Sequence, residues 1–513
     1  MESRARNSTR NIVAGVINRI ALLLLPFITR TLLINVLGSI YLGLSSLFTS
    51  ILTVLNLSEL GFGSALVYSM YKPIAEKDEK KICALLALYK KVYYLIGCIL
   101  CILGLCLLPF IPYLIKKTWP SDLNIYVLYM IFLFNTVISY FFFSYKKALL
   151  AAYQRSDLLS SINTIVSFFL YITQILLLII FRNYYIYIIV VPAFTILENI
   201  WVDLITKKKY PNIVCWGKVS KADLGEIKNH IKGIALQKIC SASRNSFDSI
   251  VISMYLGLTS IAIYGNYFYI ISSIHSFLYQ IPNAIRASVG NSVTSESLEK
   301  NYNDFKTFNF LYMWISGWCF SCLICLYQPF MDVWVGEKMM FPMRTVILFC
   351  IYFYELSMSD IIALYKDGAG LWWYGRYRTI VEAVANLVLN FWLGWLFGVN
   401  GILIATIVTM GGIGIGYGGY IVFKYYLGIK EFGRYLLKQG LYFGITIAVS
   451  LFTWFVCGFI PDMGFETLII KGLICVVVPN LLYWIVYSRF ECYLSAKELI
   501  VGIISIFYRK GKE

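Results

Sequence analysis

The sequence is poor in charged residues and in the side chains that bind metals. Charged residues make up 14% of its 513 residues, and only two histidines, His230 and His275, are present. Soluble domains carry about 25% charged residues, so the composition excludes a soluble or disordered chain. The net charge of +17 is spread along the chain and forms no single basic face, which excludes a nucleic-acid partner. Two histidines offer little from which to build a zinc or haem site.

Cysteine, by contrast, is plentiful, and nearly all of the 13 cysteines fall in apolar stretches. The spacings Cys98-x-x-Cys101 and Cys319-x-x-Cys322-x-x-Cys325 place neighbouring thiols on one helical face. Metal or redox use is one interpretation of these spacings. Buried cysteine usually acts as a small apolar packing residue, so we expect packing here, with no metal and no cofactor.

Long apolar stretches fill most of the chain. The mean hydropathy is +0.72, and 59% of the residues are hydrophobic. Fourteen stretches are long enough to cross a bilayer as helices. They cover residues 12–37, 41–68, 84–108, 123–145, 158–181, 184–205, 233–256, 259–284, 307–328, 341–365, 377–397, 400–423, 435–457 and 466–488. The sequence therefore predicts an all-α, polytopic membrane protein of about 14 transmembrane helices.

Lysine and arginine fall on alternate connections between these spans. If the N-terminus is cytoplasmic, the even connections and both termini carry 30 of the 44 Lys and Arg. The odd connections carry four, which are Lys116, Lys117, Arg182 and Lys338, and Arg344 lies at the start of the span 341–365. Cytoplasmic connections are enriched in these residues, so both termini are expected in the cytoplasm.

A weak internal repeat indicates two lobes. Gly43 and Gly265 stand at equal separations before a polar end of a span, at Glu59 and Ile281 respectively. An even number of spans precedes each copy, so both copies cross the membrane in the same direction, and such repeats place a substrate cavity between the halves. We expect a six-helix lobe at 1–205, a basic linker at 206–230, a second six-helix lobe at 231–425, and two further helices with a cytoplasmic tail at 426–513.

Two arginines inside predicted spans are the main site candidates. A central charge costs about 2.5 to 3.5 kcal/mol on insertion scales, so it must face protein or water. Arg30 lies well inside the first span, while Arg244 and Asp248 are one helical turn apart on one face of the seventh. A guanidinium holds phosphate through paired hydrogen bonds, so arginines that line a wet cavity favour a phosphorylated ligand.

Other charges are weaker candidates. Arg286 and Lys238 would add to the cavity cations, although salt bridges between lobes and snorkelling explain them equally well. Glu59 and Arg286 lie in repeat-related segments, at the ends of the second and the eighth span.

Acidic residues near the spans raise the question of ion coupling. Asp248 or Glu382 would serve coupling or gating, but a pair with Arg376 or Arg378 is the simpler explanation for Glu382. Glycines at 411–419 lie inside an apolar span with no strand before them, which favours close helix packing or local unwinding over a dinucleotide site. The other acids in or near spans are Glu198, Asp203, Glu355, Asp360 and Glu466.

Three stretches resemble the Wzx-type oligosaccharide flippases of bacterial polysaccharide export, within the MATE-like (MOP) superfamily. They are ELGFGSALVYSMYKPIAEKD at 59–78, RNSFDSIVISMYLGLTSIAIYGNY at 244–267 and LWWYGRYRTIVEAVANLVLNFWLGWLFGVNGIL at 371–403. The resemblance implies a two-lobed transporter that moves an undecaprenyl-pyrophosphate-linked oligosaccharide to the outer leaflet by alternating access. It also implies that Arg30, Arg244 and Arg286 bind the pyrophosphate.

The same resemblance implies a bacterial cytoplasmic membrane, membrane lipids as surroundings, and a polysaccharide polymerase and chain-length regulator as partners. Two alternatives remain open, a lipid II flippase and a cation-coupled multidrug exporter. A membrane enzyme would want charged residues gathered on a large outer loop, and the outer connections here are short and poor in acid–base groups. We therefore expect a transporter and no enzyme.

Overall fold

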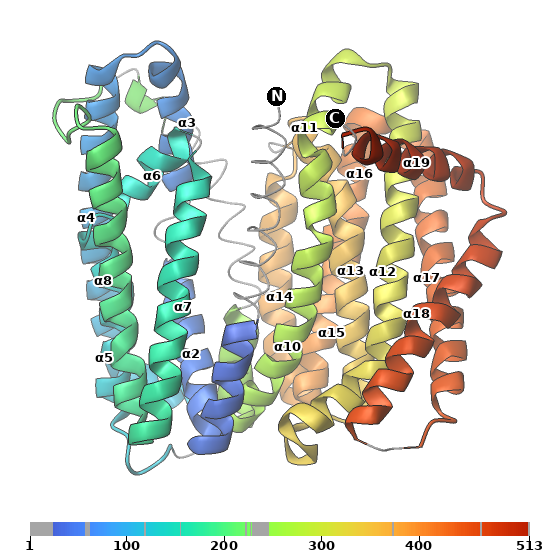
Figure 1. Ribbon diagram of the computed structural model, residues 1–513, viewed down its shortest axis with the longest axis horizontal. Coiled ribbons are helices and arrows are strands. Elements are labelled where there is room, and N and C mark those ends of the chain that lie inside the picture. The colour runs from blue at the N-terminus through green and yellow to red at the C-terminus, as the bar shows by residue number, and fades with distance from the viewer. Residues whose placement is uncertain are drawn as a thin grey trace. The chain divides into compact units, whose positions relative to one another are not determined.

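The computed structural model describes residues 24–56, 62–116, 119–153, 155–220, 223–225, 227, 246–371, 374–461 and 464–510 (Figure 1). Within these ranges all regular structure is helical and no strand forms, which confirms the predicted all-α class. The chain divides into two compact units, one within residues 13–262 and the other formed mainly by residues 263–513. The predicted lobe boundaries stay a prediction.

The first unit is built from helices that run side by side. They are Leu24–Val36, α2 (Ser39–Leu55), α3 (Phe62–Ala75), α4 (Glu79–Leu107) with the 3-10 turn η2 (Leu108–Leu114), α5 (Ile125–Phe141), α6 (Tyr145–Ala152), α7 (Ser156–Phe181), α8 (Tyr184–Lys209) and Ser246–Leu256. Side-chain caps begin several of them: the Asn124 and Asn183 amides each accept two backbone N–H groups at the starts of α5 and α8. Helix α7 ends at Arg182, whose left-handed conformation turns the chain into α8.

The residues after α8 pack against the first unit. Ile213 and Ile227 join the apolar core formed by α3, α4 and α6, and the Lys81 ammonium pairs with Asp223 at 2.8 Å. The hydrogen bond from Lys81 lowers the pKa of the Asp223 carboxyl below its usual value. Much of the described part of the predicted linker is therefore held on α4.

The second unit is centred on one long helix. It contains α10 (Leu258–Leu278), α11 (Gln280–Ser295), α12 (Leu298–Val335), the 3-10 turn η3 (Glu337–Met339), α13 (Met343–Gly368), α14 (Arg376–Phe397), α15 (Val399–Thr409), the π-helical η4 (Met410–Tyr417), α16 (Gly418–Val422), the π-helical η5 (Phe423–Leu427), the 3-10 turn η6 (Ile429–Glu431), α17 (Phe432–Cys457), α18 (Phe465–Tyr487) and α19 (Cys492–Lys510). Helix α12 packs against α13, α17 and α18. The expected C-terminal tail includes α19, which runs crosswise to α12 in Figure 1.

Two predicted spans are broken in the structure, and a third includes parts of two helices separated by residues outside the described chain. Span 123–145 ends at Phe141, and α5 meets α6 at 52° through Phe143, whose φ is +52°. Span 259–284 divides into α10 and α11, because Pro282 has no N–H for the Leu278 carbonyl and its ring disfavours a straight helix. Span 41–68 corresponds to α2, which ends at Leu55, and to α3, which begins at Phe62.

The glycine-rich stretch 411–419 is helical but widened. Residues 410–417 form a π-helix, with α-helix on either side. Single π-helical turns inside α-helices often mark functional sites. The expected local unwinding therefore takes the form of a wider helix, and no strand precedes it within the described chain.

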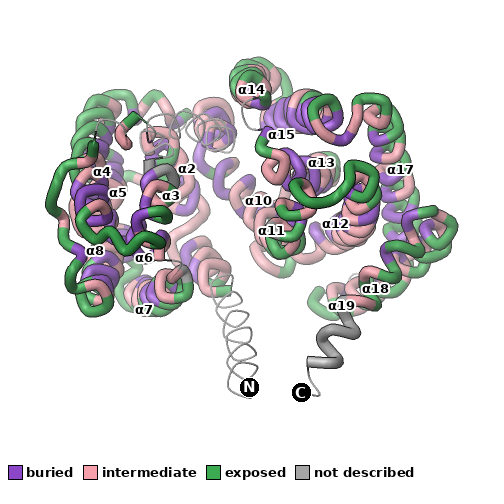
Figure 2. The backbone as a smooth tube through the Cα atoms, turned by 90° about the horizontal axis from the view of Figure 1, so that it is seen from above, coloured by how far each residue is buried: buried purple, intermediate pink, exposed green. Residues whose placement is uncertain are grey.

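Apolar side chains cover the outside of both units. Figure 2 shows buried residues on the facing sides of helices and exposed residues on their outer sides. Many exposed residues are large and hydrophobic, including Leu95, Ile102, Ile180, Trp395 and Leu473. Contiguous apolar surface of this extent fits a bilayer and not water. The described residues include nine helices that are long and apolar enough to cross a membrane, or ten if the bent α5–α6 pair counts as one; the count of 14 is not confirmed.

Candidate functional site

Arg30 lies near the middle of the helix Leu24–Val36 and is half-buried. Tyr171 in α7 and Tyr187 in α8, of the same unit, lie within electrostatic range of Arg30. A charge held beside hydroxyl groups is less costly in an apolar helix than one that faces lipid. The role of Arg30 as a ligand-binding residue stays a prediction.

A polar pocket lies in the same unit, between α2, α5 and α8. Its volume is about 230 Å³. The polar residues in its wall are Thr49, Thr53, Asn56, Asn135 and Thr136. The Tyr140 hydroxyl donates to Asn56 Oδ1, and the Thr195 hydroxyl donates to Asn135 Oδ1 at 2.8 Å, so these two amides are held in place. The wall offers hydroxyl and amide groups to an uncharged polar ligand.

The remaining candidates of the first unit are only partly described. Asp248 is 2% exposed on the helix Ser246–Leu256. Arg244, Lys238 and Glu59 lie outside the described residues. The predicted Arg244–Asp248 relationship therefore stays a prediction.

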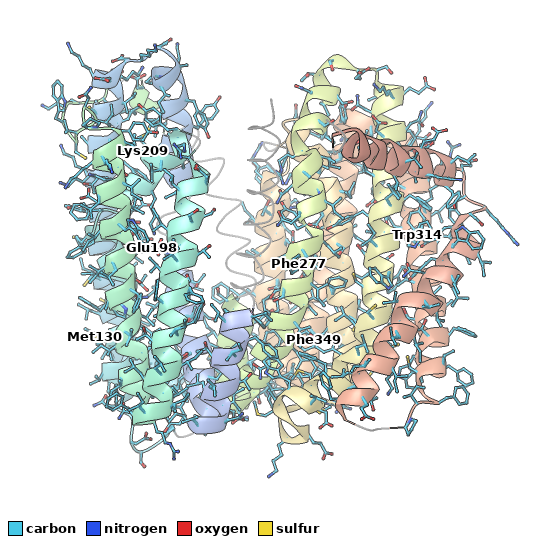
Figure 3. The ribbon with its side chains drawn as sticks, viewed as in Figure 1. Met130, Glu198, Lys209, Phe277, Trp314 and Phe349 are labelled. Atoms are coloured by element: carbon cyan, nitrogen blue, oxygen red, sulfur yellow. The ribbon has the colours of Figure 1, made fainter. Side chains whose placement is uncertain are left out.

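A basic cluster holds the bend between α5 and α6. Asp203 of α8 pairs with Lys146 of α6 and, at 2.8 Å, with Lys207. The next lysine, Lys147, pairs with Glu198 at 2.6 Å, and Figure 3 labels Glu198 on α8. Two of the acids noted in the sequence, Asp203 and Glu198, are thus matched by lysines, which gives both a structural role.

Glu382 in the second unit has an arginine partner. The Arg378 guanidinium lies 3.8 Å from the Glu382 carboxylate and donates to the Gly414 carbonyl of the π-helix at 2.7 Å. Of the two arginines considered for this pair, the structure brings Arg378 to Glu382. Glu382 and the π-helix therefore form one polar region, although a coupling role for Glu382 stays a prediction.

Arg286 is held by groups of its own unit. It pairs with Asp367 of α13 at 3.1 Å and donates to the Tyr279 hydroxyl at 2.9 Å. The side chain is 42% exposed, so the guanidinium can also reach a ligand. These contacts provide a structural role for Arg286, and its part in ligand binding stays a prediction.

The structure also shows a buried triad that the sequence patterns do not indicate. His275 Nε2 lies 2.9 Å from Asp360 Oδ2, and the Tyr312 hydroxyl donates to the same oxygen at 2.6 Å. The three residues come from α10, α13 and α12, and Asp360 is 7% exposed. In the sequence, His275 and Asp360 are each visible as a polar residue in an apolar span. Neither position indicates that the other is its partner.

Comparison with solved structures identifies the fold. No protein-family model and no curated protein matches the chain. Among solved structures, the lipid II flippase MurJ in an inward closed conformation aligns with a TM-score of 0.65 and 17% identity, covering 94% of this chain and 99% of MurJ. An inward-facing multidrug resistance MATE family transporter of the MOP superfamily aligns with a TM-score of 0.62 and 13% identity, covering 78% of this chain and 97% of its own. The chain shares the fold of these two proteins.

A eukaryotic MATE transporter shares the MOP fold with a TM-score of 0.55 and 14% identity, covering 84% of this chain and 98% of its own. These alignments differ in how much of this chain they include. The two MATE structures cover 78% and 84% of it, whereas MurJ covers 94%. The MurJ version of the MOP fold thus accounts for nearly the whole chain.

Proposed function

We propose that this protein is a flippase that moves an undecaprenyl-pyrophosphate-linked oligosaccharide across the bacterial cytoplasmic membrane by alternating access. Its product would feed capsule, O-antigen or exopolysaccharide synthesis. Its surroundings are membrane lipids, and a polysaccharide polymerase and a chain-length regulator are its expected partners. Both termini are expected in the cytoplasm, and the protein catalyses no covalent step.

The observation that carries this proposal is the alignment with a lipid II flippase along nearly the full length of both chains. A lipid II flippase moves a lipid-linked head group, and we infer a substrate of the same kind for this chain. The MATE alternatives leave more of this chain unmatched. A substrate with a lipid tail also needs a protein with extensive apolar outer surface, which this chain has.

The first unit offers chemistry that suits the two parts of such a head group. The Arg30 guanidinium can hold a pyrophosphate through paired hydrogen bonds, because its planar fork matches two phosphate oxygens. The hydroxyl and amide groups around Thr49, Asn56 and Asn135 can bind the hydroxyls of a sugar. Arg244, Lys238 and Arg286 would add positive charge, while Glu59, Asp248 and Glu382 would serve gating or coupling.

The direction of transport follows from charge. A membrane potential that is negative inside favours outward movement of an anion by about 2.3 kcal/mol per charge per 100 mV. A doubly charged head group that crosses the whole field would thus gain about 5 kcal/mol at about 100 mV. This electrical free energy alone could drive export, and polymerisation outside the cell would remove the product.

A lipid II flippase is the second candidate, since the MurJ alignment supports either lipid-linked head group equally. The two functions differ in the head group and not in the fold. Loss of lipid II export kills the cell, whereas loss of a capsule or O-antigen exporter usually does not. A cation-coupled drug exporter is the third candidate, and Asp248→Asn would then impair transport more than the arginine substitutions.

The experiment is to measure lipid-linked oligosaccharides in a deletion strain and to locate them with a glycan probe that acts only from outside. Intact units that accumulate on the cytoplasmic side would support the proposal and reveal the sugars. Normal display outside would overturn it. Complementation with an Arg30→Ala, Arg244→Ala double variant should fail, while Arg344→Ala, at an exposed helix start, should restore display.

A further inference from the structure

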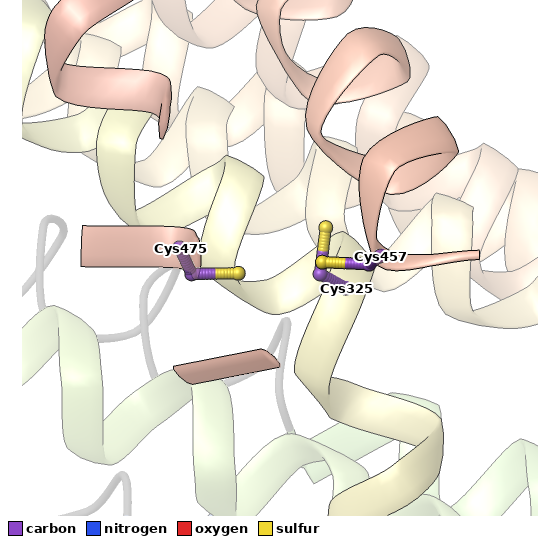
Figure 4. Close-up of side chains that lie close together, drawn as sticks. All are labelled: Cys325, Cys457 and Cys475. Carbon is purple, nitrogen blue, oxygen red and sulfur yellow. The ribbon is translucent and has the colours of Figure 1, made fainter. Parts of the chain in front are cut away.

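Three buried cysteines from three helices meet in the second unit. Cys325 of α12, Cys457 at the end of α17 and Cys475 of α18 are 4%, 2% and 1% exposed, and their sulfurs all lie within 4.8 Å of one another. In Figure 4 the Cys475 side chain points toward the other two. Cys325 is part of the Cys319-x-x-Cys322-x-x-Cys325 spacing, for which we expected a packing role. The fold brings Cys457 and Cys475 next to Cys325.

We propose that these three thiols form a binding site for a thiolate-seeking divalent cation of the zinc type. Zinc prefers sulfur and imidazole ligands, and a tetrahedral ion with Zn–S bonds of about 2.3 Å holds its sulfurs about 3.8 Å apart. Sulfurs within 4.8 Å need only a small contraction to reach that spacing. The fourth position can be taken by water, because Cys325 and Cys457 line a cavity.

The cysteine cluster lies beside a cavity, and a lysine near it can offset the negative charge of bound thiolates. Cys325 and Cys457 line a cavity of about 860 Å³, whose wall also contains Lys471, Asp332 and Glu337. Two carboxylates in this wall can draw a cation toward the thiols. Three thiolates and one divalent cation leave a single negative charge, and the Lys471 ammonium, one turn from Cys475, can offset it.

Hydrogen bonds hold Cys475 in place beside α12. The Trp318 indole N–H donates to the Cys475 carbonyl at 2.8 Å, and the Cys322 thiol contacts the same carbonyl at 3.8 Å. Such contacts fix a ligand before the metal binds. The ion would tie α17 and α18, the two helices outside the predicted six-plus-six repeat, to the central helix α12.

The test uses the full-length protein in detergent, prepared under reducing conditions and loaded with zinc, with metal content measured after desalting. We expect one zinc per chain, and an upward shift of the melting temperature on loading. Cys325→Ala, Cys457→Ala and Cys475→Ala should each abolish both, whereas Cys319→Ala, on α12 outside the cluster, should keep both. Zinc binding that persists in the three variants, or that is absent from the unaltered protein, would overturn the site.

A spectroscopic measurement removes the dependence on variants that fold. Cobalt substituted into the unaltered protein should give the intense sulfur-to-metal absorption of a tetrahedral thiolate site. Cobalt that shows only the weak absorption of an oxygen-ligated ion would contradict the proposal. So would a disulfide among these cysteines in protein alkylated directly in the membrane, because it would leave too few thiolates.

Discussion

Gly401 lies directly against the backbone of Leu393. A methyl group on the Gly401 Cα would stand 1.8 Å from the Leu393 carbonyl oxygen, at the corner where α14 turns into α15. No side chain can occupy this position unless the two helices separate. Small residues at such crossings let membrane helices approach closely.

Gly401→Ala should therefore destabilise the protein by about 3 kcal/mol, the upper range for overpacking. Unfolding by SDS in mixed micelles would measure this change. Gly440→Ala is the matched control, because Gly440 lies on α17 with open space around it. Alanine should there raise helix stability by less than about 1 kcal/mol. Equal stability of the two variants would contradict the contact.

The Asp360 triad gives a second prediction. Tyr312→Phe removes the hydroxyl that donates to Asp360 and leaves a buried carboxylate with one fewer donor. The loss should cost about 1 to 3 kcal/mol. The same SDS titration applies, with Tyr113→Phe as control because Tyr113 is 78% exposed. If both variants unfold alike, the Tyr312 hydrogen bond adds nothing to stability.

The ion pairs at the α5–α6 bend predict that substitutions of Lys146 and Asp203 have non-additive effects on stability. Lys146 and Asp203 are 10% and 5% exposed, so Asp203→Leu alone leaves a buried cation and should cost about 3 to 5 kcal/mol. Adding Lys146→Met should recover most of that loss, since Lys207 is 63% exposed and can turn to water. A double variant no more stable than Asp203→Leu would show that Lys146 and Asp203 are not coupled.

The Lys81–Asp223 pair predicts a pH effect in the segment that packs on α4. Lys81 lowers the pKa of Asp223, so the pair contributes stability above the unfolded-state pKa of about 3.9. That stability is lost as the pH falls through the lower folded-state pKa. The pair is partly exposed, and the effect should not exceed about 1 kcal/mol. Hydrogen exchange of residues 210–220, corrected for intrinsic rates, should rise only in acid, and Asp223→Asn should remove the pH dependence.

The sequence predicts the unbroken spans well because their signal is local. The stretches 158–181 and 184–205 correspond to Ser156–Phe181 and Tyr184–Lys209, since continuous apolar runs between polar caps suffice to define a membrane helix. The bend after Phe141 is not predictable in this way, because residues 141–144 are Phe-Phe-Phe-Ser and contain neither proline nor glycine. Here the lysine pairs, and not a helix-breaking residue, accompany the bend.

The site residues are only partly predictable, for a related reason. Arg30 is visible as a charge in an apolar run, and Glu382 has its arginine about one helical turn earlier. His275 and Asp360, however, are 85 residues apart, and Cys325 and Cys475 are separated by still more. No periodicity connects such positions, so only the packing of separate helices brings them together.

The last prediction concerns what Arg30 contributes beyond its charge. A lysine keeps the positive charge but presents a single ammonium, so it cannot match two phosphate oxygens at once. In vesicles with the reconstituted protein and a fluorescent polyprenyl-pyrophosphate saccharide, Arg30→Lys should slow transport about tenfold, for loss of one charge-assisted hydrogen bond worth about 1.5 kcal/mol. Arg30→Ala should slow it further, and Arg344→Lys should match the unaltered protein. Full activity of Arg30→Lys would mean that Arg30 acts as a diffuse charge and that the paired-hydrogen-bond model for the pyrophosphate is wrong.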